Sequence, residues 1–248
     1  MGVRILMYTQ PKTNIKLEDC TFYHSFNFPD GTIVNGDWDL RYCIKEYLGN
    51  INYEGKRVMD VGAASGYLSF QMEKWGANVV SFDMLDGSYW DVLKYPGYIP
   101  AKHSNYHIKM YNAYYYAHEK FKSKCKIYHA NIYNDLPEFL GNFDGAVFGT
   151  MLSHVRDPML VLMNVLYHVK EFAVMINPFP DSAGSTFMPS LNNFERTWWN
   201  LSIDTIDRMV SSIGWEIKNI TEVWPIQNVL LDEPQKRPYK SIVIKRRS

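Results

Sequence analysis

Cysteines and long apolar runs are both scarce in this sequence. Its 248 residues include three cysteines, Cys20, Cys43 and Cys125, which are far apart and form no Cys-x-x-Cys pair. This number and spacing argue against a disulfide framework or a thiolate metal site, and they suit a reducing compartment. No apolar run approaches the roughly 18 residues of a membrane span, and no signal-peptide pattern opens the chain. We therefore expect a soluble, cytoplasmic protein with no membrane contact and no bound metal.

An excess of charge of one sign is also lacking, because 26 Lys and Arg residues balance 26 Asp and Glu residues. The chain thus has no overall positive field to draw it to nucleic acid, so a small-molecule partner is favoured over tRNA. Aromatic residues, in contrast, make up 15% of the chain, with 18 Tyr and 7 Trp. Their flat rings and polar tips indicate a cleft for a planar or hydroxylated ligand, with compositional drift as the alternative.

Short β-rich runs alternate with helical stretches after about Lys56, which is the pattern of an α/β sheet. The runs predict seven strands, at residues 57–61, 78–82, 126–129, 145–148, 172–176, 215–223 and 241–245. Apolar residues at helical spacing predict helices at residues 66–75, 158–169 and 202–213.

Two segments lie outside this minimal sheet. Residues 1–50 precede the first buried strand and are rich in aromatic residues, which predicts a cap or lid ahead of a main domain at 51–248. Residues 84–124 separate two strands by about forty residues, far beyond a usual connection, and contain many tyrosines. We predict that this second segment is a helical insertion that helps to form a site, with a surface elaboration as the alternative.

The sequence around the first predicted strand carries the chemistry. An apolar run ends in Asp60-Val61-Gly62-Ala63-Ala64-Ser65-Gly66 and opens a helix, so the glycines permit a tight turn against which a ligand can lie. Asp83 follows the next strand, 23 residues after Asp60, where a carboxylate can accept both hydroxyls of a ribose. These features predict a nucleoside pocket.

The kind of nucleoside follows from a missing motif. A dinucleotide site needs Gly-x-Gly-x-x-Gly beside the pyrophosphate, and this turn lacks it. An acid stands ahead of the first glycine instead, where it would repel pyrophosphate but attract an ammonium group. This favours S-adenosylmethionine (SAM), whose methionine end is zwitterionic and whose sulfonium is cationic.

The chain therefore resembles the class I SAM-dependent methyltransferases. The resemblance implies a Rossmann-like, doubly wound sheet of seven strands, mostly parallel with a reversed last strand, and SAM as the cofactor. It also implies where the cofactor binds, with Asn131 near the adenine amine or, alternatively, capping a turn. Trp38 is predicted to close over the sulfonium by cation-π attraction, or to anchor the cap. The predicted cofactor contacts are Trp38, Asp60, Gly62, Ala63, Gly66, Asp83, Met84, Asn131, Ile132 and Thr150.

A narrower resemblance covers roughly residues 22 to 245. Trp38-Asp39, the Leu152-x-His154-x-x-x-Pro158 ending and the block 194–215 are similar to the tRNA wobble-uridine 5-oxyacetic acid methyltransferase family. Those enzymes transfer a carboxymethyl group from carboxy-SAM to a hydroxyuridine oxygen. The tyrosine that they place beside the loop histidine is Ser153 here, and their long basic N-terminal region is missing. The resemblance thus implies an oxygen acceptor, while its departures favour ordinary SAM and count against tRNA.

His154, directly after the fourth strand, is the candidate catalytic residue. Imidazole titrates near neutral pH, so His154 is placed to take a proton from a hydroxyl acceptor during in-line methyl transfer; shaping the loop is its alternative role. We predict O-methylation of a small metabolite such as a sugar, a phenolic or a natural-product intermediate. Wobble-uridine modification of tRNA and a non-catalytic SAM-binding regulator are the rival functions, and a homo-oligomer is left open. Arg41, beside several acids, is expected to form a surface ion pair.

Overall fold

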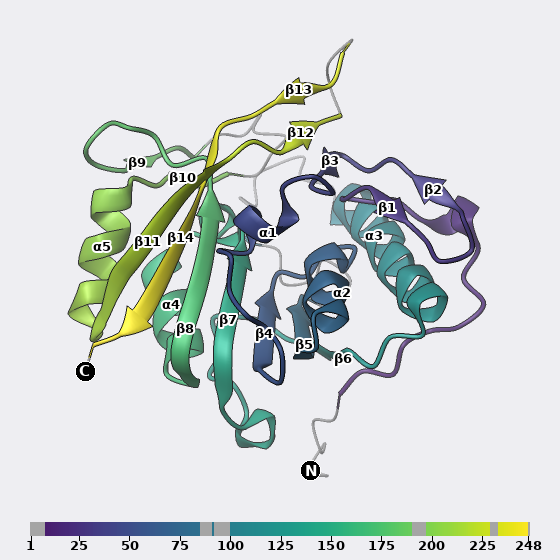
Figure 1. Cartoon of the computed structure of the whole chain (residues 1–248), viewed down its shortest axis with the longest axis horizontal. Coiled ribbons are helices and arrows are strands. Elements are labelled where there is room, and N and C mark those ends of the chain that lie inside the picture. Colours follow the sequence, from purple (N-terminus) through teal and green to yellow (C-terminus); the bar gives the residue numbers. More distant parts are fainter. Residues whose placement is uncertain (1–7, 85–90, 92–99, 190–196, 229–232, 248) are drawn as a thin grey trace.

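The computed structural model describes residues 8–84, 91, 100–189, 197–228 and 233–247. Its centre is a seven-stranded sheet in the order β11-β14-β8-β7-β4-β5-β6 (Figure 1). The strands are β4 (Arg57–Val61), β5 (Asn78–Asp83), β6 (Lys126–His129), β7 (Phe143–Gly149), β8 (Val169–Asn177), β11 (Trp215–Val223) and β14 (Tyr239–Arg246). All seven predicted strands are confirmed.

The sheet is parallel from β6 to β8, and β14 is antiparallel to both β8 and β11. The predicted reversed last strand is therefore present. Strand β8 is longer than the apolar run that predicted it, because Val169 also pairs with Phe143 of β7, beyond a shift in register at exposed Lys170 and Glu171. At this end, backbone pairing extends beyond the apolar residues, so the hydrophobic pattern alone predicts too short a strand.

Helices cover both faces of the sheet, as a buried parallel sheet requires. Side chains from α1 (Ile44–Tyr47), α2 (Tyr67–Lys74) and α3 (Pro100–Phe121) form one hydrophobic core with the first face. Side chains from α4 (Pro158–Leu166) and α5 (Ile203–Ser212) form a second hydrophobic core with the opposite face of the sheet. Asp157 and Ser202 cap the N-termini of α4 and α5 by accepting from backbone amides. The helices predicted at 66–75 and 202–213 are thus present, and the one predicted at 158–169 is present but ends at Leu166, because Val169 already belongs to β8.

Helix α3 provides the helix expected within residues 84–124. It connects β5 to β6, which are parallel neighbours, and parallel neighbours need such a crossover. Tyr111, Tyr114 and Tyr115 on this helix are buried in the core on the α2 side of the sheet. The tyrosines at positions 89, 95 and 98 lie outside the described residues.

The N-terminal segment packs over the α2 and α3 side of the sheet. The hairpin of β1 (Phe26–Asn27) and β2 (Ile33–Val34) buries Phe26, which stacks on Phe28 with ring centroids 5.3 Å apart. Strand β3 (Trp38–Asp39) pairs with β12 (Ile226–Gln227), which in turn pairs with β13 (Gln235–Lys236). The segment 1–50 thus shares a small sheet with residues near the other end of the chain, which sequence patterns do not reveal.

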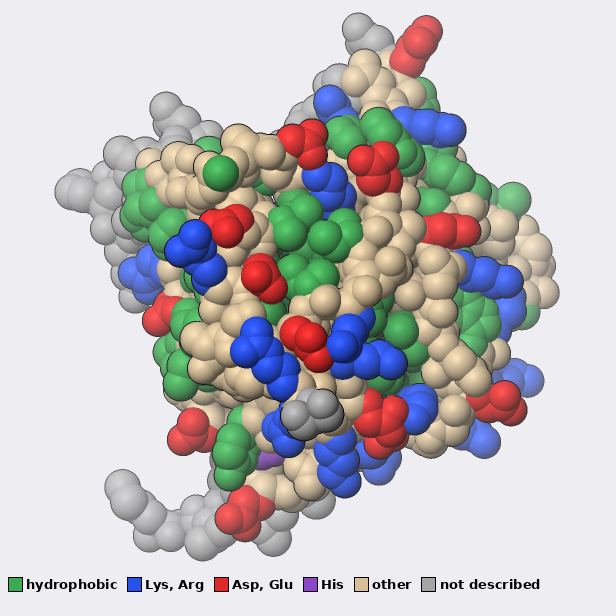
Figure 2. Space-filling view, turned by 60° about the vertical axis from the view of Figure 1, so that its left-hand side comes forward, with side chains coloured by type: hydrophobic (Ala, Val, Ile, Leu, Met, Phe, Trp, Pro, Cys, Tyr) green, Lys and Arg blue, Asp and Glu red, His purple; other side chains and the backbone are tan. Residues whose placement is uncertain are grey.

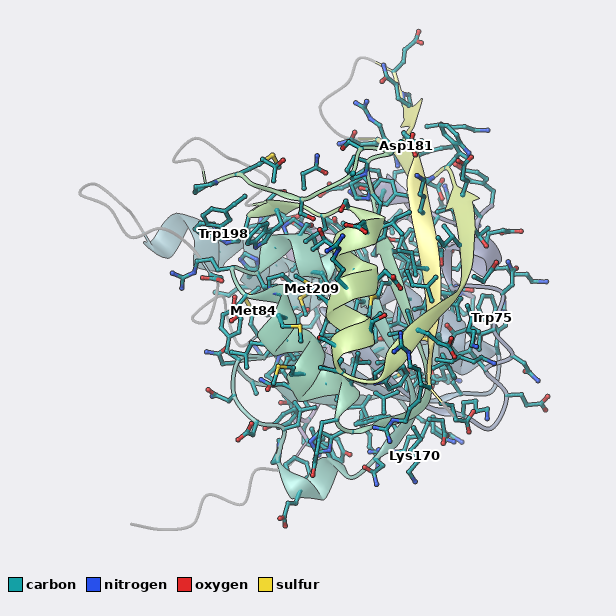
Figure 3. All side chains as sticks on the ribbon, turned by 90° about the vertical axis from the view of Figure 1, so that its left-hand side faces the viewer. Trp75, Met84, Lys170, Asp181, Trp198 and Met209 are labelled. Atoms are coloured by element: carbon teal, nitrogen blue, oxygen red, sulfur yellow. The ribbon has the colours of Figure 1, made fainter. Side chains whose placement is uncertain are left out.

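The carboxyl ends of the parallel strands meet at one edge of the sheet. Figure 3 shows this edge at the top, where Asp181 follows β8, while Lys170 near the start of β8 lies at the bottom. Strand order reverses between β4 and β7, whose neighbours β5 and β8 lie on opposite sides. Ligands of open α/β sheets bind at the carboxyl ends of the strands beside such a reversal. Two short strands, β9 (Thr186–Phe187) and β10 (Trp199–Asn200), also pair near this edge.

Candidate cofactor and acceptor site

The turn after β4 has the backbone that its glycines predict. Gly62 and Gly66 adopt φ of 81° and 85°, a region that side chains with a Cβ rarely enter. A Cβ added to Gly66 would lie 2.5 Å from Phe70 Cε2 and 2.7 Å from Tyr114 Cδ2. The amides of Gly62 and Ala63 both donate to the Phe82 carbonyl, at 2.9 and 3.1 Å. The turn is therefore fastened to β5.

Asp83, at the end of β5, lies against this turn. Its Oδ2 accepts from the Ala64 amide at 2.7 Å, and its Oδ1 accepts from the Met84 amide at 2.7 Å and the Tyr111 hydroxyl at 3.3 Å. Burial raises the pKa of Asp83, and the two backbone hydrogen bonds oppose that shift. The structure thus brings the glycine turn and the predicted ribose acid into direct contact.

A cavity, which we call the acidic cavity, opens beside Asp83. Its empty space, open solvent included, is about 220 Å³. His129 lies on its wall, with Nδ1 3.1 Å from the Met84 carbonyl and Nε2 3.3 Å from the Tyr115 hydroxyl. The acidic cavity is lined by Ala63, Ala64, Ser81, Asp83, Tyr111, Tyr114, Tyr115, Ile127 and His129.

Asp60, a predicted cofactor contact, lies inside the fold at the end of β4. Its side chain is fully buried, lines neither of the two cavities described, and accepts from the Ser69 hydroxyl of α2 at 2.5 Å. Ser69, Ser81 and Tyr114 continue this contact as a chain of hydroxyls 2.7 Å apart. Oδ1 of Asp60 has no hydrogen-bond partner among the described residues. Burial raises the pKa of Asp60 to about 7.

A second cavity, which we call the aromatic cavity, lies at the carboxyl end of β7. It is lined by Tyr23, His24, Trp38, Leu40, Tyr47, Thr150, Pro225 and Tyr239. Thr150 follows β7 with a φ of 64°, and its hydroxyl lies 3.2 Å from that of Tyr47. The ring centroids of Trp38 and Tyr239 are 5.4 Å apart. Two predicted cofactor contacts, Trp38 and Thr150, therefore meet in one cavity.

The remaining predicted contacts follow β5 and β6. Met84 is half-buried, and its carbonyl lies beside His129, as described above. Asn131 is half-buried and its Oδ1 accepts from the Tyr133 amide at 3.0 Å, so its oxygen caps a turn. The Ile132 carbonyl accepts from Asn164 Nδ2 at 3.0 Å. Both residues lie at the carboxyl edge, on the β6 side of Asp83.

His154 ends the 3₁₀ helix Met151–His154 that follows β7. Its side chain is half-buried and does not line the aromatic cavity. The loop around it is braced by the segment before β10, since the Trp198 amide donates to the Ser153 carbonyl at 2.7 Å. Arg156 forms an ion pair with buried Asp91. Trp198 is buried at this upper edge (Figure 3), whereas position 194 lies outside the described residues.

Arg41 pairs with Asp39 through Nε at 2.9 Å and Nη2 at 2.6 Å, which confirms the expected ion pair. Within the described residues no group of three or more His, Cys, Asp or Glu side chains could hold a metal ion. In the same part of the chain, every helix is too short or too polar to cross a membrane.

Several lining residues carried no signal that would have identified them in the sequence. His24, Tyr47 and Tyr239 reach the aromatic cavity from three separate parts of the chain. Ser65 belongs to the glycine motif, but its hydroxyl accepts from the His24 amide at 3.3 Å, a contact across 41 residues. Only folding brings these residues to one place.

Comparisons with known proteins give structural matches only. No protein-family model and no curated protein sequence matches the chain. Among solved structures, 1,6-didemethyltoxoflavin-N1-methyltransferase of Burkholderia thailandensis, with S-adenosylhomocysteine bound, gives a TM-score of 0.55 at 11% identity, over 84% of this chain and 78% of the other. Magnesium protoporphyrin IX methyltransferase of Synechocystis PCC 6803 gives 0.53 at 13% identity, over 84% and 81%.

A third match, a SAM-dependent methyltransferase of Methanosarcina mazei, gives a TM-score of 0.53 at 12% identity, over 80% of this chain and 95% of the other. The strand order, the reversed β14 and these matches define the fold class. The chain has the Rossmann-like class I methyltransferase fold, as the glycine motif predicted.

Proposed function

We propose that this protein is a SAM-dependent methyltransferase that acts on a small molecule. The observation that carries the proposal is the contact between Asp83 and the glycine turn, in which Asp83 Oδ2 accepts from the Ala64 amide at 2.7 Å. It places a carboxylate and a turn that needs glycine side by side at the carboxyl edge, where this fold class binds its cofactor. The neighbours named above support the same cofactor, since one contains S-adenosylhomocysteine and another is named for SAM.

The residues at this edge fit the parts of SAM. Asp83 has two oxygens with about four acceptor positions, of which three are used, so a ribose hydroxyl can bind without breaking its backbone contacts. Asn131 and Ile132, with Met84, would face the adenine, while Gly62, Ala63 and Gly66 allow the methionine part to approach the backbone. Trp38 and Thr150 would border the sulfonium. SAM supplies a methyl group on a positively charged sulfur.

Asp60 takes a supporting part in this proposal. Because it is fully buried, bonded to Ser69 and absent from the lining of both cavities, we propose that it acts on the ammonium group of SAM through the turn. It is a positioning residue, and its raised pKa makes its charge dependent on pH near neutrality.

Transfer to an oxygen atom is the favoured chemistry. The resemblance of the Leu152 to Pro158 stretch to enzymes that modify a hydroxyl supports it, and His154 is the proposed base that takes the hydroxyl proton. Names of the neighbouring structures, which refer to a toxoflavin precursor and a magnesium porphyrin, support a small-molecule acceptor. Because the same stretch resembles that of the wobble-uridine enzymes, modification of the tRNA wobble uridine is the second candidate function. The face in Figure 2 mixes Lys and Arg with Asp and Glu, so it offers no single-sign surface to tRNA.

Two measurements test the proposal. Calorimetry with S-adenosylhomocysteine should show stoichiometric binding, and incubation with SAM and a metabolite extract should give a product heavier by one methyl group. His154→Ala should then lower turnover by roughly 10²- to 10⁴-fold with unchanged cofactor affinity. Binding without any product would favour a SAM-binding regulator, and salt-sensitive tRNA binding that competes with turnover would favour the wobble base. No binding at all would refute the cofactor assignment.

A further inference from the structure

We propose that the aromatic cavity is the acceptor pocket, that it takes an uncharged ring bearing a hydroxyl group, and that His24 Nδ1 is the hydrogen-bond contact of that hydroxyl. The inference rests on the proposed methyltransferase function and names the acceptor class for it. It begins from an anomaly: His24 lines the cavity, is 5% exposed, and its Nδ1 has no hydrogen-bond partner among the described residues. Buried polar atoms are nearly always paired, so an atom without a partner among the described residues is a candidate contact for a bound ligand.

The position of His24 is built into the fold. Its amide donates to Ser65 Oγ of the glycine turn at 3.3 Å, and its backbone forms a bridge with Trp38. Gly36 packs so closely on it that an added Cβ would lie 2.3 Å from the His24 carbonyl carbon. The ring centroid of Tyr23 lies 4.8 Å from that of His24, edge to face. These contacts hold the backbone of His24 beside the glycine turn, and its side chain packs against Tyr23 at the wall of the aromatic cavity.

The walls of the cavity favour an uncharged aromatic ligand. The rings of Trp38 and Tyr239 belong to its lining, and the hydroxyls of Tyr47 and Thr150, also in the lining, lie 3.2 Å apart. None of the lining side chains, all of them among the described residues, carries a permanent charge. A carboxylate or an ammonium group would lose its hydration there without gaining a counter-ion, whereas a ring gains contact area.

Protonation keeps the cavity neutral. Burial lowers the pKa of His24 to about 3, so the imidazole is uncharged at physiological pH. Burial likewise raises the pKa of Tyr47, which keeps its hydroxyl protonated. A neutral imidazole can present Nδ1 as a donor or as an acceptor, depending on its tautomer. As a donor, it would hold the oxygen of the acceptor hydroxyl in place.

The test uses three ring probes of similar size that differ in one group. We would titrate 4-fluorophenol, fluorobenzene and 4-fluorobenzoate into the full chain saturated with S-adenosylhomocysteine and follow the fluorine NMR signals. The wild type should bind 4-fluorophenol about tenfold more tightly than fluorobenzene, and 4-fluorobenzoate least. His24→Phe should erase the preference for the hydroxyl, because the ring remains and Nδ1 does not. His24→Asn, whose amide replaces Nδ1, should restore most of it.

His168→Phe is the matched control, because His168 lies just before β8, at the opposite end of the sheet, and should keep the wild-type order. If His24→Phe does not fold, His24→Leu, which also lacks Nδ1, takes its place and should lose the preference for the hydroxyl in the same way. Equal affinity for the three probes, tightest binding of 4-fluorobenzoate, or an unchanged preference in His24→Phe would overturn the inference. If S-adenosylhomocysteine binds but the phenol is not preferred, this inference fails and the proposed function stands. If the phenol is preferred but S-adenosylhomocysteine does not bind, the proposed function fails and the pocket assignment stands.

Discussion

The acidic cavity and the aromatic cavity lie at the same edge of the sheet but are built in opposite ways. The acidic cavity is formed by neighbouring strands, β4 to β6, and by helix α3, and its main polar group is the carboxylate of Asp83. The aromatic cavity is formed by segments near 24, 47, 150 and 239 and has no permanently charged group on its described walls. The difference suggests a division of labour in which one cavity serves a polar cofactor and the other a neutral acceptor.

The largest expected effect is the loss of cofactor affinity on substitution of Asp83, and it tests whether the acidic cavity alone serves the cofactor. Asp83→Asn removes the charge that would hold the ribose hydroxyls, and hydrogen bonds to charged groups contribute roughly 1.5–3 kcal/mol each. We expect the affinity for S-adenosylhomocysteine to fall about 100-fold by calorimetry, with little change in binding of 4-fluorophenol. Asp207→Asn, an exposed acid on α5, is the control and should change neither. Unchanged cofactor affinity in Asp83→Asn would remove the acidic cavity from the cofactor site.

The next effect concerns the pH dependence of stability and the buried Asp60. Because the folded-state pKa of Asp60 is raised from 3.8 to about 7, the folded protein binds this proton more tightly than the unfolded chain. The group therefore stabilises the fold at low pH and loses that contribution as pH rises towards 7. At 1.36 kcal/mol per pKa unit, the loss between pH 5 and pH 8 is about 2.5 kcal/mol.

Urea unfolding of the wild type and Asp60→Asn at several pH values measures this contribution. The free energy of unfolding of the wild type should fall relative to that of the variant as pH rises from 5 to 7, and the difference should level off above that. The slope, rather than the absolute stability, is diagnostic, because the asparagine amide adds a constant cost of its own. Parallel pH profiles would show that Asp60 stays ionised in the fold, and the pKa assignment would fail.

A smaller effect is expected from Gly66, whose turn borders the acidic cavity. Gly66→Ala must accept a φ of 85° and a Cβ 2.5 Å from Phe70 Cε2. Gly214→Ala faces a similar φ of 81°, but nothing lies within 4 Å of its Cβ. Chemical denaturation should therefore show Gly66→Ala to be less stable than Gly214→Ala by about 2 kcal/mol, the typical cost of overpacking. Equal losses would mean that backbone strain alone makes glycine necessary at position 66.

The smallest effect tests the aromatic cavity. Tyr47→Phe removes the hydroxyl that lies 3.2 Å from Thr150 Oγ1, a neutral hydrogen bond that contributes roughly 1 kcal/mol. The unfolding free energy should drop by about that amount, while cofactor affinity stays within twofold. Tyr167→Phe, on a residue that is 80% exposed, should have no measurable effect on stability. A large loss of cofactor affinity in Tyr47→Phe would show that the aromatic cavity also contributes to cofactor binding.

Much of the main sheet could be read from the chain, because the alternation of β-rich runs and helical stretches is a local property. The seven strands and the glycine turn follow this rule, and Asp83 lies at the predicted strand end. The position of Asp60 could not be read in the same way. Its motif predicts a contact with a ligand, yet its strand points it towards Ser69 on α2, and side-chain direction depends on the sheet's pleat and its cover.

The amino acid sequence by itself determined the α/β sheet, its glycine turn and the acid that faces the turn, because hydrophobic period, glycine spacing and strand ends act over a few residues. Only the tertiary structure decided the aromatic cavity, the pairing of β3 with β12 and the burial of His24 Nδ1 away from any hydrogen-bond partner among the described residues. These features join residues up to about two hundred positions apart, and such contacts form only when the sheet brings distant segments together. The physical reason is that burial and hydrogen-bond pairing depend on three-dimensional neighbours, whereas a local pattern reports only neighbours in the chain.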